Sequence, residues 1–503
     1  MPVARQVLAH AATAPDRVAV LAGDAPPLTY AELAARALTE SAALMHDGVL
    51  PGQVVAIDLA GGAVDALVAL LAVDLAGAVA LMCDGTWTPA QRAEILAATG
   101  PDHHLTALTR STTPPADGSA DEPVPVSDDD LAWGGFTSGS TGRPRAVVRS
   151  RGSWTRSFDA TSNLTTITAA DTVLIPGPLS TSLFCFGAVH AFAVGATVRL
   201  APSVAAALGD LGELGACDVV HLVPAALGVV LDALASPTPP ASRLRMAVVG
   251  GAALPPGARE RAAAHGISVV AYYGATELSF VAIDPDGDGL RPFPGVEIEI
   301  RDPSTGLSLT PARPVGGTDG TGTRTTSGLG EVWVRSPWIA HGYLAGARGP
   351  LRTADRWASV GDLAELTTSD AGHPRDPSSR LLLRGRGTGA ITVGAATVVP
   401  EDVEAVLRTV PGVRDVVVLG TPHPRLGQVV TAVVVGRDGA DLDLETLDRS
   451  CRDRLSPAQR PRRWFSADAL PVTGTGKPAR AVVQADLAEQ NPAYRPARSH
   501  SLS

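Results

Sequence analysis

Helix-like and strand-like segments alternate along the first half of the chain. Residues 28–33 open a helical stretch, 54–59 read as an apolar strand, and 62–80 as an apolar helical stretch. Further β-like runs, spaced by helix-length intervals, follow at 172–176, 197–200, 218–223, 245–249 and 268–272. Such alternation is typical of a parallel sheet buried between layers of helices. The sequence therefore predicts a large α/β domain.

The character of the chain changes near residue 287. Segments 296–300, 330–334 and 380–383 are β-rich, and the Gly/Thr/Pro-rich connections at 302–329 have the composition of exposed loops. After the glycine-rich stretch 384–389, the pattern predicts a helix, two strands and a second helix, at 400–407, 413–419, 429–435 and 443–455. We therefore expect a large N-terminal domain over 1–386, with layered α/β subdomains and a β-rich subdomain. A small, mobile α+β domain over 387–503 would follow a glycine hinge.

Composition excludes several classes of function. The 503 residues exceed one typical domain, and 45% apolar with 18% charged residues is ordinary for a globular enzyme. No apolar run reaches the roughly 20 residues of a membrane span. A net charge of −10 without a basic, aromatic-rich stripe argues against nucleic acid as a partner. Four scattered cysteines and an N-terminus without an apolar signal core predict a cytoplasmic protein. We expect a monomer or a homodimer.

Lys477 is the only lysine in the chain, although Lys and Arg together number 41. Lysine is a compact point charge on a flexible stem and can follow a moving charge, whereas the planar guanidinium of arginine would overfill such a site. Residues 471–477 form a Gly/Thr-rich turn, which suits a loop better than a core. Lys477 is therefore a candidate catalytic residue, with codon bias as the alternative explanation.

A second polar segment lies at 136–145. Residues 137–142 contain four hydroxyl side chains and two glycines, directly after a short apolar run. Backbone N–H groups and hydroxyls in such a loop can surround phosphate oxygens. The loop lacks the GxxxxGK[ST] pattern of a Walker loop. It is therefore a candidate phosphate loop of another kind, the alternative being a plain linker.

Together with other short motifs, these segments resemble the acyl-adenylate-forming superfamily, which includes acyl- and aryl-CoA synthetases, adenylation domains and luciferases. The motifs occur in the family's order at 28–33, 136–145, 273–277, 330–331, 342–343, 361–362, 385–386 and 476–477. The resemblance implies that a carboxylate attacks the α-phosphate of ATP and releases pyrophosphate, and that a thiol then attacks the acyl-adenylate. It also implies that the small domain rotates between the two steps.

The resemblance assigns roles to individual residues. Tyr273 would stack on adenine, Thr276 would contact the α-phosphate, and Glu277 would bind Mg²⁺. Asp362 would accept the ribose hydroxyls, and Lys477 would stabilise charge in the transition state. The expected ATP and AMP site comprises Thr137, Ser138, Gly139, Ser140, Thr141, Gly142, Arg145, Gly251, Ala252, Tyr273, Gly274, Thr276, Asp362 and Arg386.

The chain departs from the family pattern at four places. Arg145 stands where lysine is usual, which keeps the charge. Thr181 occupies a position often held by an aromatic residue or His, and Thr388 replaces the usual hinge Asp beside Gly387. In the loop expected to line the thiol tunnel, Ala395 replaces a glycine unless the register shifts to Gly394. These departures concern the second half-reaction more than the first.

Amino-acid-activating relatives hold the substrate ammonium with an Asp, and Ser182 occupies that position here. Residues 183–190 contain no carboxylate, and an unpaired ammonium would be costly to bury. The expected substrate is therefore an acid without an α-amine, and aryl, fatty and polycyclic acids remain open. The predicted acyl pocket comprises Phe184, Phe186, Gly187, His190, Val249, Gly250, Ala275 and Phe280. His190 would contact a polar group of the substrate or serve as an ordinary core histidine.

The first functional hypothesis is an AMP-forming acyl-CoA synthetase of secondary metabolism or acid catabolism, using ATP, Mg²⁺ and coenzyme A. The second is a free-standing adenylating enzyme that loads a carrier-protein phosphopantetheine or an amine, which Thr181 and Ala395 favour. A nucleotide-binding pseudoenzyme is the third, and the intact Glu277 and Lys477 argue against it.

Overall fold

The computed structural model describes most of the chain in separate ranges. They are 3–59, 62–109, 123–137, 145–209, 215–239, 242–309, 325–368, 379–386, 391–393, 396–423, 427–437, 443–455, 457, 459–472 and 478–497. Several predicted site residues lie outside them: Ser138, Gly139, Ser140, Thr141, Gly142, Gly387, Thr388, Gly394, Ala395 and Lys477. Their roles stay predictions.

Contacts between residues divide the chain into two compact units. The first holds the described residues of Met1–Gly139, Arg143–Ile298 and Val334–Ala358. The second holds those of Glu299–Trp333 and Ser359–Ser503. These units do not meet at the expected domain boundary, 386/387. That boundary concerns which part of the chain rotates between the two reaction steps, and it stays a prediction.

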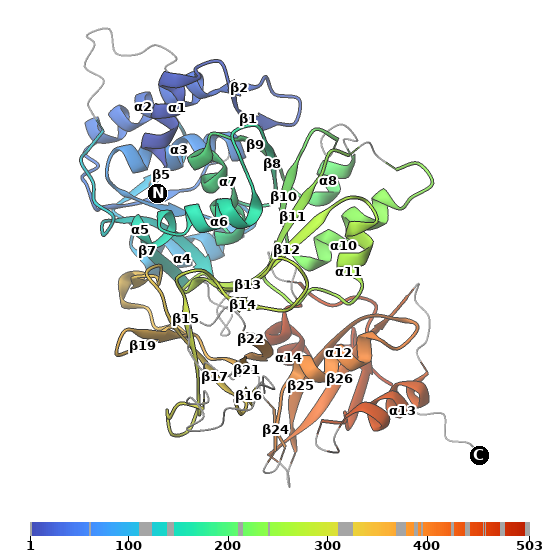
Figure 1. Ribbon diagram of the computed structural model, residues 1–503. Helices are drawn as coiled ribbons and strands as arrows, with labels where there is room; N and C mark the ends of the chain where they lie inside the picture. Colours follow the sequence, from blue (N-terminus) through green and yellow to red (C-terminus); the bar gives the residue numbers. More distant parts are fainter. Residues whose placement is uncertain are drawn as a thin grey trace, which may run out of the picture. The chain divides into compact units, whose positions relative to one another are not determined.

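A nine-stranded sheet forms the centre of the first unit (Figure 1). Its order is β14-β13-β12-β11-β10-β8-β9-β1-β2, and the consecutive pairs from β12 to β1 are parallel. Its strands are β1 Val18–Ala22, β2 Leu28–Thr29, β8 Thr172–Pro176, β9 Thr197–Ala201, β10 Val219–Leu222, β11 Met246–Gly250, β12 Ser268–Ala275, β13 Ser279–Asp284 and β14 Arg291–Pro292. Strands β10 and β11 are buried at every residue, as expected for interior strands of a parallel sheet.

Helices cover both faces of this sheet. Helices α8 (Val204–Gly209), α10 (Pro224–Leu234) and α11 (Ala258–Ala263) enclose one core, which includes Val220, Leu222 and Val249. Helices α6 (Phe158–Thr165) and α7 (Ser182–Val194) lie on the other side (Figure 1), where α7 contacts β8, β9 and β10. Because side chains alternate along a strand, Val219 and His221 of β10 point toward α7.

A six-stranded sheet in the order β18-β7-β6-β4-β3-β5 completes the α/β part. Its strands are β3 Val54–Ile57, β4 Val79–Met82, β5 His103–Leu105, β6 Leu131–Thr137, β7 Arg145–Ser150 and β18 Gly342–Tyr343. The segments beside it are α3 Ala63–Leu75, α4 Pro89–Thr99, α5 Gly152–Thr155 and the 3-10 turn η1 Leu344–Gly346, whereas α2 Tyr30–His46 contacts β1 and β2, and α1 Ala4–Thr13 packs against α2 and α3. The predicted helical stretch 62–80 was too long, because Gly77, at φ 70°, turns the chain from α3 into β4.

The β-rich region forms a seven-stranded sheet in which β16-β21-β17-β20-β19 is the main path, β15 pairs with β17 and β22 pairs with β21. Its strands are β15 Glu297–Arg301, β16 Thr325–Thr326, β17 Gly330–Arg335, β19 Arg352–Ala354, β20 Trp357–Ser359, β21 Asp362–Thr368 and β22 Arg380–Arg386. The division into units passes through β15 and β17. The predicted β-rich segments are thereby confirmed.

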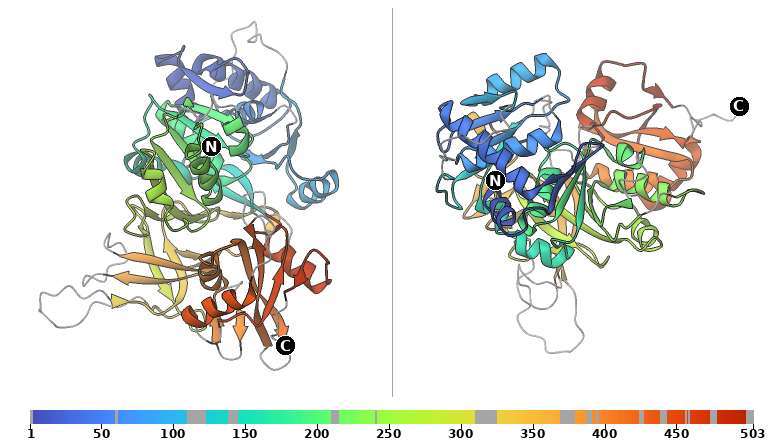
Figure 2. Two further views of the ribbon diagram at one scale, coloured as in Figure 1. Left: turned by 90° about the vertical axis from the view of Figure 1, so that its right-hand side faces the viewer. Right: turned by 90° about the horizontal axis from the view of Figure 1, so that it is seen from above.

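The C-terminal region has its own sheet, drawn orange to red in Figure 2. Its order is β24-β23-β26-β27-β28, with β25 paired to β26. Its strands are β23 Ile391–Val393, β24 Ala396–Val398, β25 Val413–His423, β26 Gly427–Gly436, β27 Arg463–Ser466 and β28 Arg495–Pro496, and its helices are α12 Pro400–Arg408, α13 Leu444–Arg454 and α14 Arg480–Ala488. Helices α12 and α13 share one core with it and α14 another. The expected small α+β region is confirmed.

Within the described residues, none of the helices combines the length and the hydrophobicity that crossing a bilayer requires.

Candidate active site

The turn between β12 and β13 presents Thr276 and Glu277 at the carboxyl end of β12. Leu278 N donates to Ala275 O at 3.1 Å, and Ser279 takes a positive φ of 59° to enter β13. A Cβ at Gly274 would lie 2.1 Å from Ser279 O, so only glycine fits there. The predicted motif therefore forms a tight, fixed turn at the edge where ligands of parallel sheets bind.

Glu277 is only 4% exposed, which is unusual for an acidic side chain. Tyr343 Oη donates to Glu277 Oε1 at 2.9 Å, and Ala340 N donates to Glu277 O at 2.8 Å. Burial, and then the Glu277 carboxylate, raise the pKa of Tyr343, while the nearby Arg145 guanidinium acts in the opposite direction. The carboxylate of Glu277 is therefore fixed in orientation by a phenol that stays protonated.

Arg149 supports the same turn from beneath. Its side chain donates to the carbonyls of Thr276, Trp338 and Ser153, and its guanidinium lies 5.8 Å from the centre of the Trp154 ring. Burial lowers the pKa of Arg149 to about 9, and the Glu277 carboxylate opposes that shift. The sequence motifs did not single out this residue. The sequence feature that could have revealed it is an arginine directly after the apolar residues 146–148 of one strand.

The Thr276 hydroxyl also meets the start of α7. Thr276 Oγ1 lies 3.0 Å from the Oγ of Ser182, the first residue of that helix. A helix N-terminus carries partial positive charge and unpaired N–H groups, both favourable to an anion. The two hydroxyls and the helix end therefore form a polar spot that suits a carboxylate or a phosphate oxygen.

Aromatic side chains continue from this spot along α7. Phe186 contacts Phe280, Phe158 and Trp154 with ring centres 4.9, 5.7 and 5.5 Å apart. Tyr272 contacts Phe280 at 4.7 Å. Phe186 and Phe280, both predicted pocket residues, are thus brought together in an apolar wall.

The other predicted pocket residues have different surroundings. Phe184 packs on Gly177, where a Cβ would lie 2.0 Å from its ring, and Gly250 packs on the Tyr272 ring. Val249 belongs to the core on the α10 side of the sheet, so the structure does not bring it to the Phe186 cluster. Ala275 precedes Thr276 at the end of β12. His190 Nε2 lies 2.9 Å from Ser162 Oγ.

The described nucleotide candidates occupy strand ends in both units. Thr137 and Arg145 are partners in the β6–β7 pair, so both ends of segment 138–144 are held side by side. Asp362 and Arg386 are partners in the β21–β22 pair of the second unit. Tyr273 lies in β12, and Gly251 and Ala252 follow β11.

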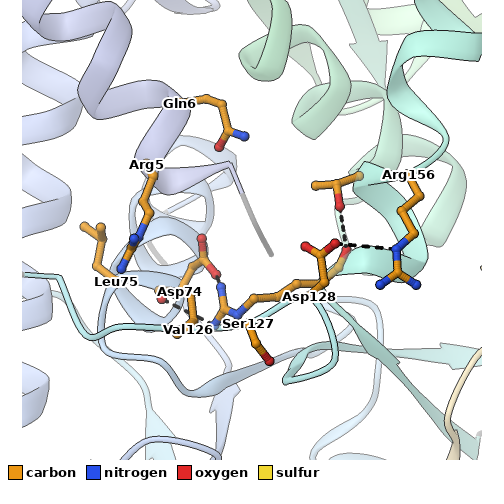
Figure 3. Close-up of a pocket in the computed structure, with 10 residues that line it drawn as sticks. Arg5, Gln6, Asp74, Leu75, Val126, Ser127, Asp128 and Arg156 are labelled. Carbon is orange, nitrogen blue, oxygen red and sulfur yellow. Dashed lines mark hydrogen bonds and ion pairs between the residues drawn. The ribbon is translucent and has the colours of Figure 1, made fainter.

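A separate cavity of about 420 Å³ lies in the first unit (Figure 3). It is lined by Arg5, Gln6, Asp74, Leu75, Val126, Ser127, Asp128, Arg151, Thr155 and Arg156. Buried Arg151 forms an ion pair with Asp74, whose carboxylate also accepts from Ala4 N at 3.2 Å. No predicted site residue lines this cavity, and its charged groups tie α1, α3 and the end of β7 together.

The described residues contain no group of three or more His, Cys, Asp or Glu side chains suited to holding a metal ion by themselves. Glu277 can offer its second carboxylate oxygen, Oε2, because Oε1 already accepts a hydrogen bond from Tyr343 Oη. Mg²⁺ is commonly bound by one or two carboxylates together with substrate phosphates. A single buried carboxylate therefore fits the predicted metal role only beside a phosphate ligand.

Comparison with known proteins agrees with the motifs. Residues 7–344 match the AMP-binding enzyme family, and residues 402–477 match the C-terminal domain of AMP-binding enzymes. An uncharacterized acyl–CoA ligase of Bacillus subtilis is 32% identical over 442 residues, covering 82% of this chain and 84% of that protein. A fatty acid–[acyl-carrier-protein] ligase of Mycobacterium marinum is 26% identical over 494 residues, covering 93% of this chain and 87% of that protein.

A solved structure has the same fold. The amide bond synthetase McbA of Marinactinospora thermotolerans superposes with a TM-score of 0.78 at 28% identity, covering 96% of this chain and 99% of that one. The chain therefore belongs to the AMP-binding enzyme family, within the acyl-adenylate-forming superfamily that its motifs resemble, and is a ligase.

Proposed function

We propose that this enzyme uses ATP and Mg²⁺ to activate a carboxylic acid without an α-amine, and then transfers the acyl group to coenzyme A. The observation that carries the proposal is the fixed Thr276–Glu277 turn beside the N-terminus of α7. Thr276 Oγ1 lies 3.0 Å from Ser182 Oγ there, and the aromatic wall of Phe186 and Phe280 continues from it. A polar anchor next to an apolar wall suits an acid with a hydrophobic body.

In the first step, a carboxylate oxygen of the substrate attacks the α-phosphorus of ATP, and pyrophosphate leaves. Thr276, Ser182 and the N–H groups at the start of α7 orient the reacting anions. Glu277 would hold Mg²⁺, whose positive charge would help to neutralise the triphosphate. Lys477 stabilises the negative charge that grows at phosphorus in the transition state.

In the second step, the thiol of coenzyme A attacks the acyl carbon of the adenylate. The carbon–sulfur bond forms, AMP leaves, and the thiol proton passes to solvent or a base. The absence of any carboxylate from Ser182 to Val194 supports an acid rather than an amino acid, because no group there can pair with an ammonium. The names of the Bacillus and Mycobacterium relatives support a thiol as acceptor.

A second candidate differs only in the acceptor. The acyl-carrier-protein ligase and the amide bond synthetase, both similar to this chain, favour a carrier-protein phosphopantetheine or an amine. Thr181, at the start of α7, and Ala395 are the departures that affect this step. The first half-reaction is common to both candidates.

The test separates activation from transfer. ATP–pyrophosphate exchange, measured across aryl, fatty and polycyclic acids, should rise above the acid-free control for one class of acid. That acid is then incubated with coenzyme A, with a phosphopantetheinylated carrier protein, and with an amine. We expect acyl-CoA to form when coenzyme A is the acceptor and no carrier protein or amine is present. Product only with the carrier or the amine would support the second candidate, and no exchange with any acid would contradict both.

A further inference from the structure

His221 is a polar residue in a buried parallel strand, where apolar residues are usual. It lies on β10, in the middle of the nine-stranded sheet, and is 2% exposed. Its neighbours Val220 and Leu222 belong to the core on the α10 side, so its own ring points toward α7. Among the described residues, Nε2 of His221 has no hydrogen-bond partner.

Gly187 of α7 faces this ring. A Cβ at Gly187 would lie 2.8 Å from His221 Cγ and 2.9 Å from Cδ2, closer than atoms of two side chains can approach. Glycine within a helix is unfavourable relative to alanine, but here the missing side chain leaves room for the imidazole of His221. A larger residue at position 187 would stabilise the helix itself but would displace the His221 ring.

His190, one turn beyond Gly187, adds a second buried imidazole. It is 0% exposed, and it stacks on Phe186 with ring centres 6.0 Å apart. Burial lowers the pKa of His190 to about 4, and burial followed by the charge of His190 lowers that of His221 to about 3. Both rings are neutral at physiological pH, so they suit a neutral hydrogen-bonding group rather than a second carboxylate.

The distance along α7 from Ser182 to Gly187 indicates how long an acid must be to reach His221. Ser182 marks the reacting end, because its Oγ lies 3.0 Å from Thr276 Oγ1. Gly187 is five residues further along α7, which corresponds to roughly 7.5 Å of helix rise. That rise is comparable to the span of an aromatic acid from its carboxylate to the far side of its ring, and Phe186 and Phe280 provide aromatic surfaces beside it.

We propose that the acid is aromatic and carries a neutral hydrogen-bonding substituent, such as a hydroxyl, on the side far from its carboxylate, and that His221 binds this substituent. The proposal rests on the proposed function and names the substrate class of the same site. A buried polar atom without a partner is unfavourable, and the substrate supplies that partner when it binds. Acids that lack the substituent leave the imidazole unpaired and are disfavoured.

The test compares matched acids in ATP–pyrophosphate exchange: 4-hydroxycinnamic, 4-methylcinnamic and cinnamic acid, with the 2- and 3-hydroxy isomers and decanoic acid. For wild type we expect kcat/KM with one hydroxylated isomer to exceed that with the methyl analogue by roughly 10- to 100-fold. His221→Leu should abolish this preference, so that kcat/KM for the hydroxylated isomer falls to that for the methyl analogue. His221→Asn, which retains a hydrogen-bonding group, should keep part of it.

Two further variants keep the result interpretable. His265→Leu changes an exposed histidine of the same unit and should leave the preference intact. Gly187→Ala places a methyl group against the His221 ring and should weaken the preference without removing the imidazole. Thermal unfolding confirms that each variant is folded.

A folded His221→Leu enzyme that still prefers the hydroxylated acid would overturn the proposal, as would a wild type that uses these acids without preference or prefers decanoic acid. Exchange with a polycyclic acid alone would also overturn the proposal while leaving the proposed function intact. Absence of exchange with aryl, fatty and polycyclic acids alike would instead contradict the proposed function itself.

Discussion

Replacing Arg149 by Met should damage both stability and adenylation, because one buried guanidinium supports the whole Thr276–Glu277 turn. Arg149 is 1% exposed and donates to three main-chain carbonyls, those of Thr276, Trp338 and Ser153. Methionine fills a similar volume but donates nothing. The three carbonyls and the Glu277 carboxylate would then lose their cationic neighbour.

The magnitude follows from these contacts. A buried acceptor left without a donor costs about 1–3 kcal/mol, and Arg149 donates to three main-chain carbonyls. We therefore expect Arg149→Met to lower the free energy of unfolding by about 3–5 kcal/mol. A turn displaced by about 1 Å would also lower the adenylation rate by about 10²-fold.

Urea unfolding followed by tryptophan fluorescence measures the first effect, since the Trp154 ring lies 5.8 Å from the Arg149 guanidinium. Pyrophosphate exchange in the absence of urea measures the second. Arg156→Met is the matched control: its side chain is 42% exposed, so it should change the free energy of unfolding by no more than about 0.5 kcal/mol. An Arg149→Met enzyme with a wild-type unfolding midpoint and wild-type exchange would show that Arg149 does not support the Thr276–Glu277 turn.

Three further predictions concern the metal, the hinge and pH. Glu277→Gln keeps the shape but removes the anionic ligand, so adenylation should fall sharply and excess Mg²⁺ should restore only part of it; an unchanged Mg²⁺ titration would place the metal elsewhere. Thr388→Pro should spare adenylation but slow thiolation of preformed acyl-adenylate, because proline cannot absorb a large change in φ; normal rates of both steps would exclude a pivot there. Since the folded pKa values of His190 and His221, about 4 and about 3, lie below the ordinary 6.5, the unfolded chain binds more protons as the pH falls through 6.5. The free energy of unfolding should then decrease by about 1 kcal/mol per histidine between pH 7 and pH 5.5, and His221→Leu should remove its share of that decrease.

Sequence patterns predicted the elements that depend on local composition. Strand β11 followed from a continuous apolar run, and α13 followed from an amphipathic segment that Asp443 caps by accepting hydrogen bonds from Glu445 N and Thr446 N. The end of α3 was missed, because the turn at Gly77 interrupts an apolar run that itself shows no change. The short strand β27 and the helix α14 were also not predicted.

The site was predictable only where a motif is contiguous in the chain. Thr276 and Glu277 belong to one five-residue motif, so their proximity was certain. Arg149, in contrast, reaches Thr276 and Trp338 across 127 and 189 residues of sequence. Such contacts depend on how β7 meets the β12–β13 turn, which periodicity along one strand does not specify. The orientation of His221 toward Gly187 likewise required knowing which face of β10 packs against α7.

The most direct test of the account measures ATP–pyrophosphate exchange with the preferred acid in wild type, Lys477→Ala and Lys477→Arg, alongside the affinity of each for ATP. We predict that both variants bind ATP nearly normally but lose exchange by orders of magnitude, because a lysine acting in the transition state contributes little to ground-state binding. Exchange at the wild-type rate in Lys477→Ala would contradict the proposal that this chain forms an acyl-adenylate with its single lysine.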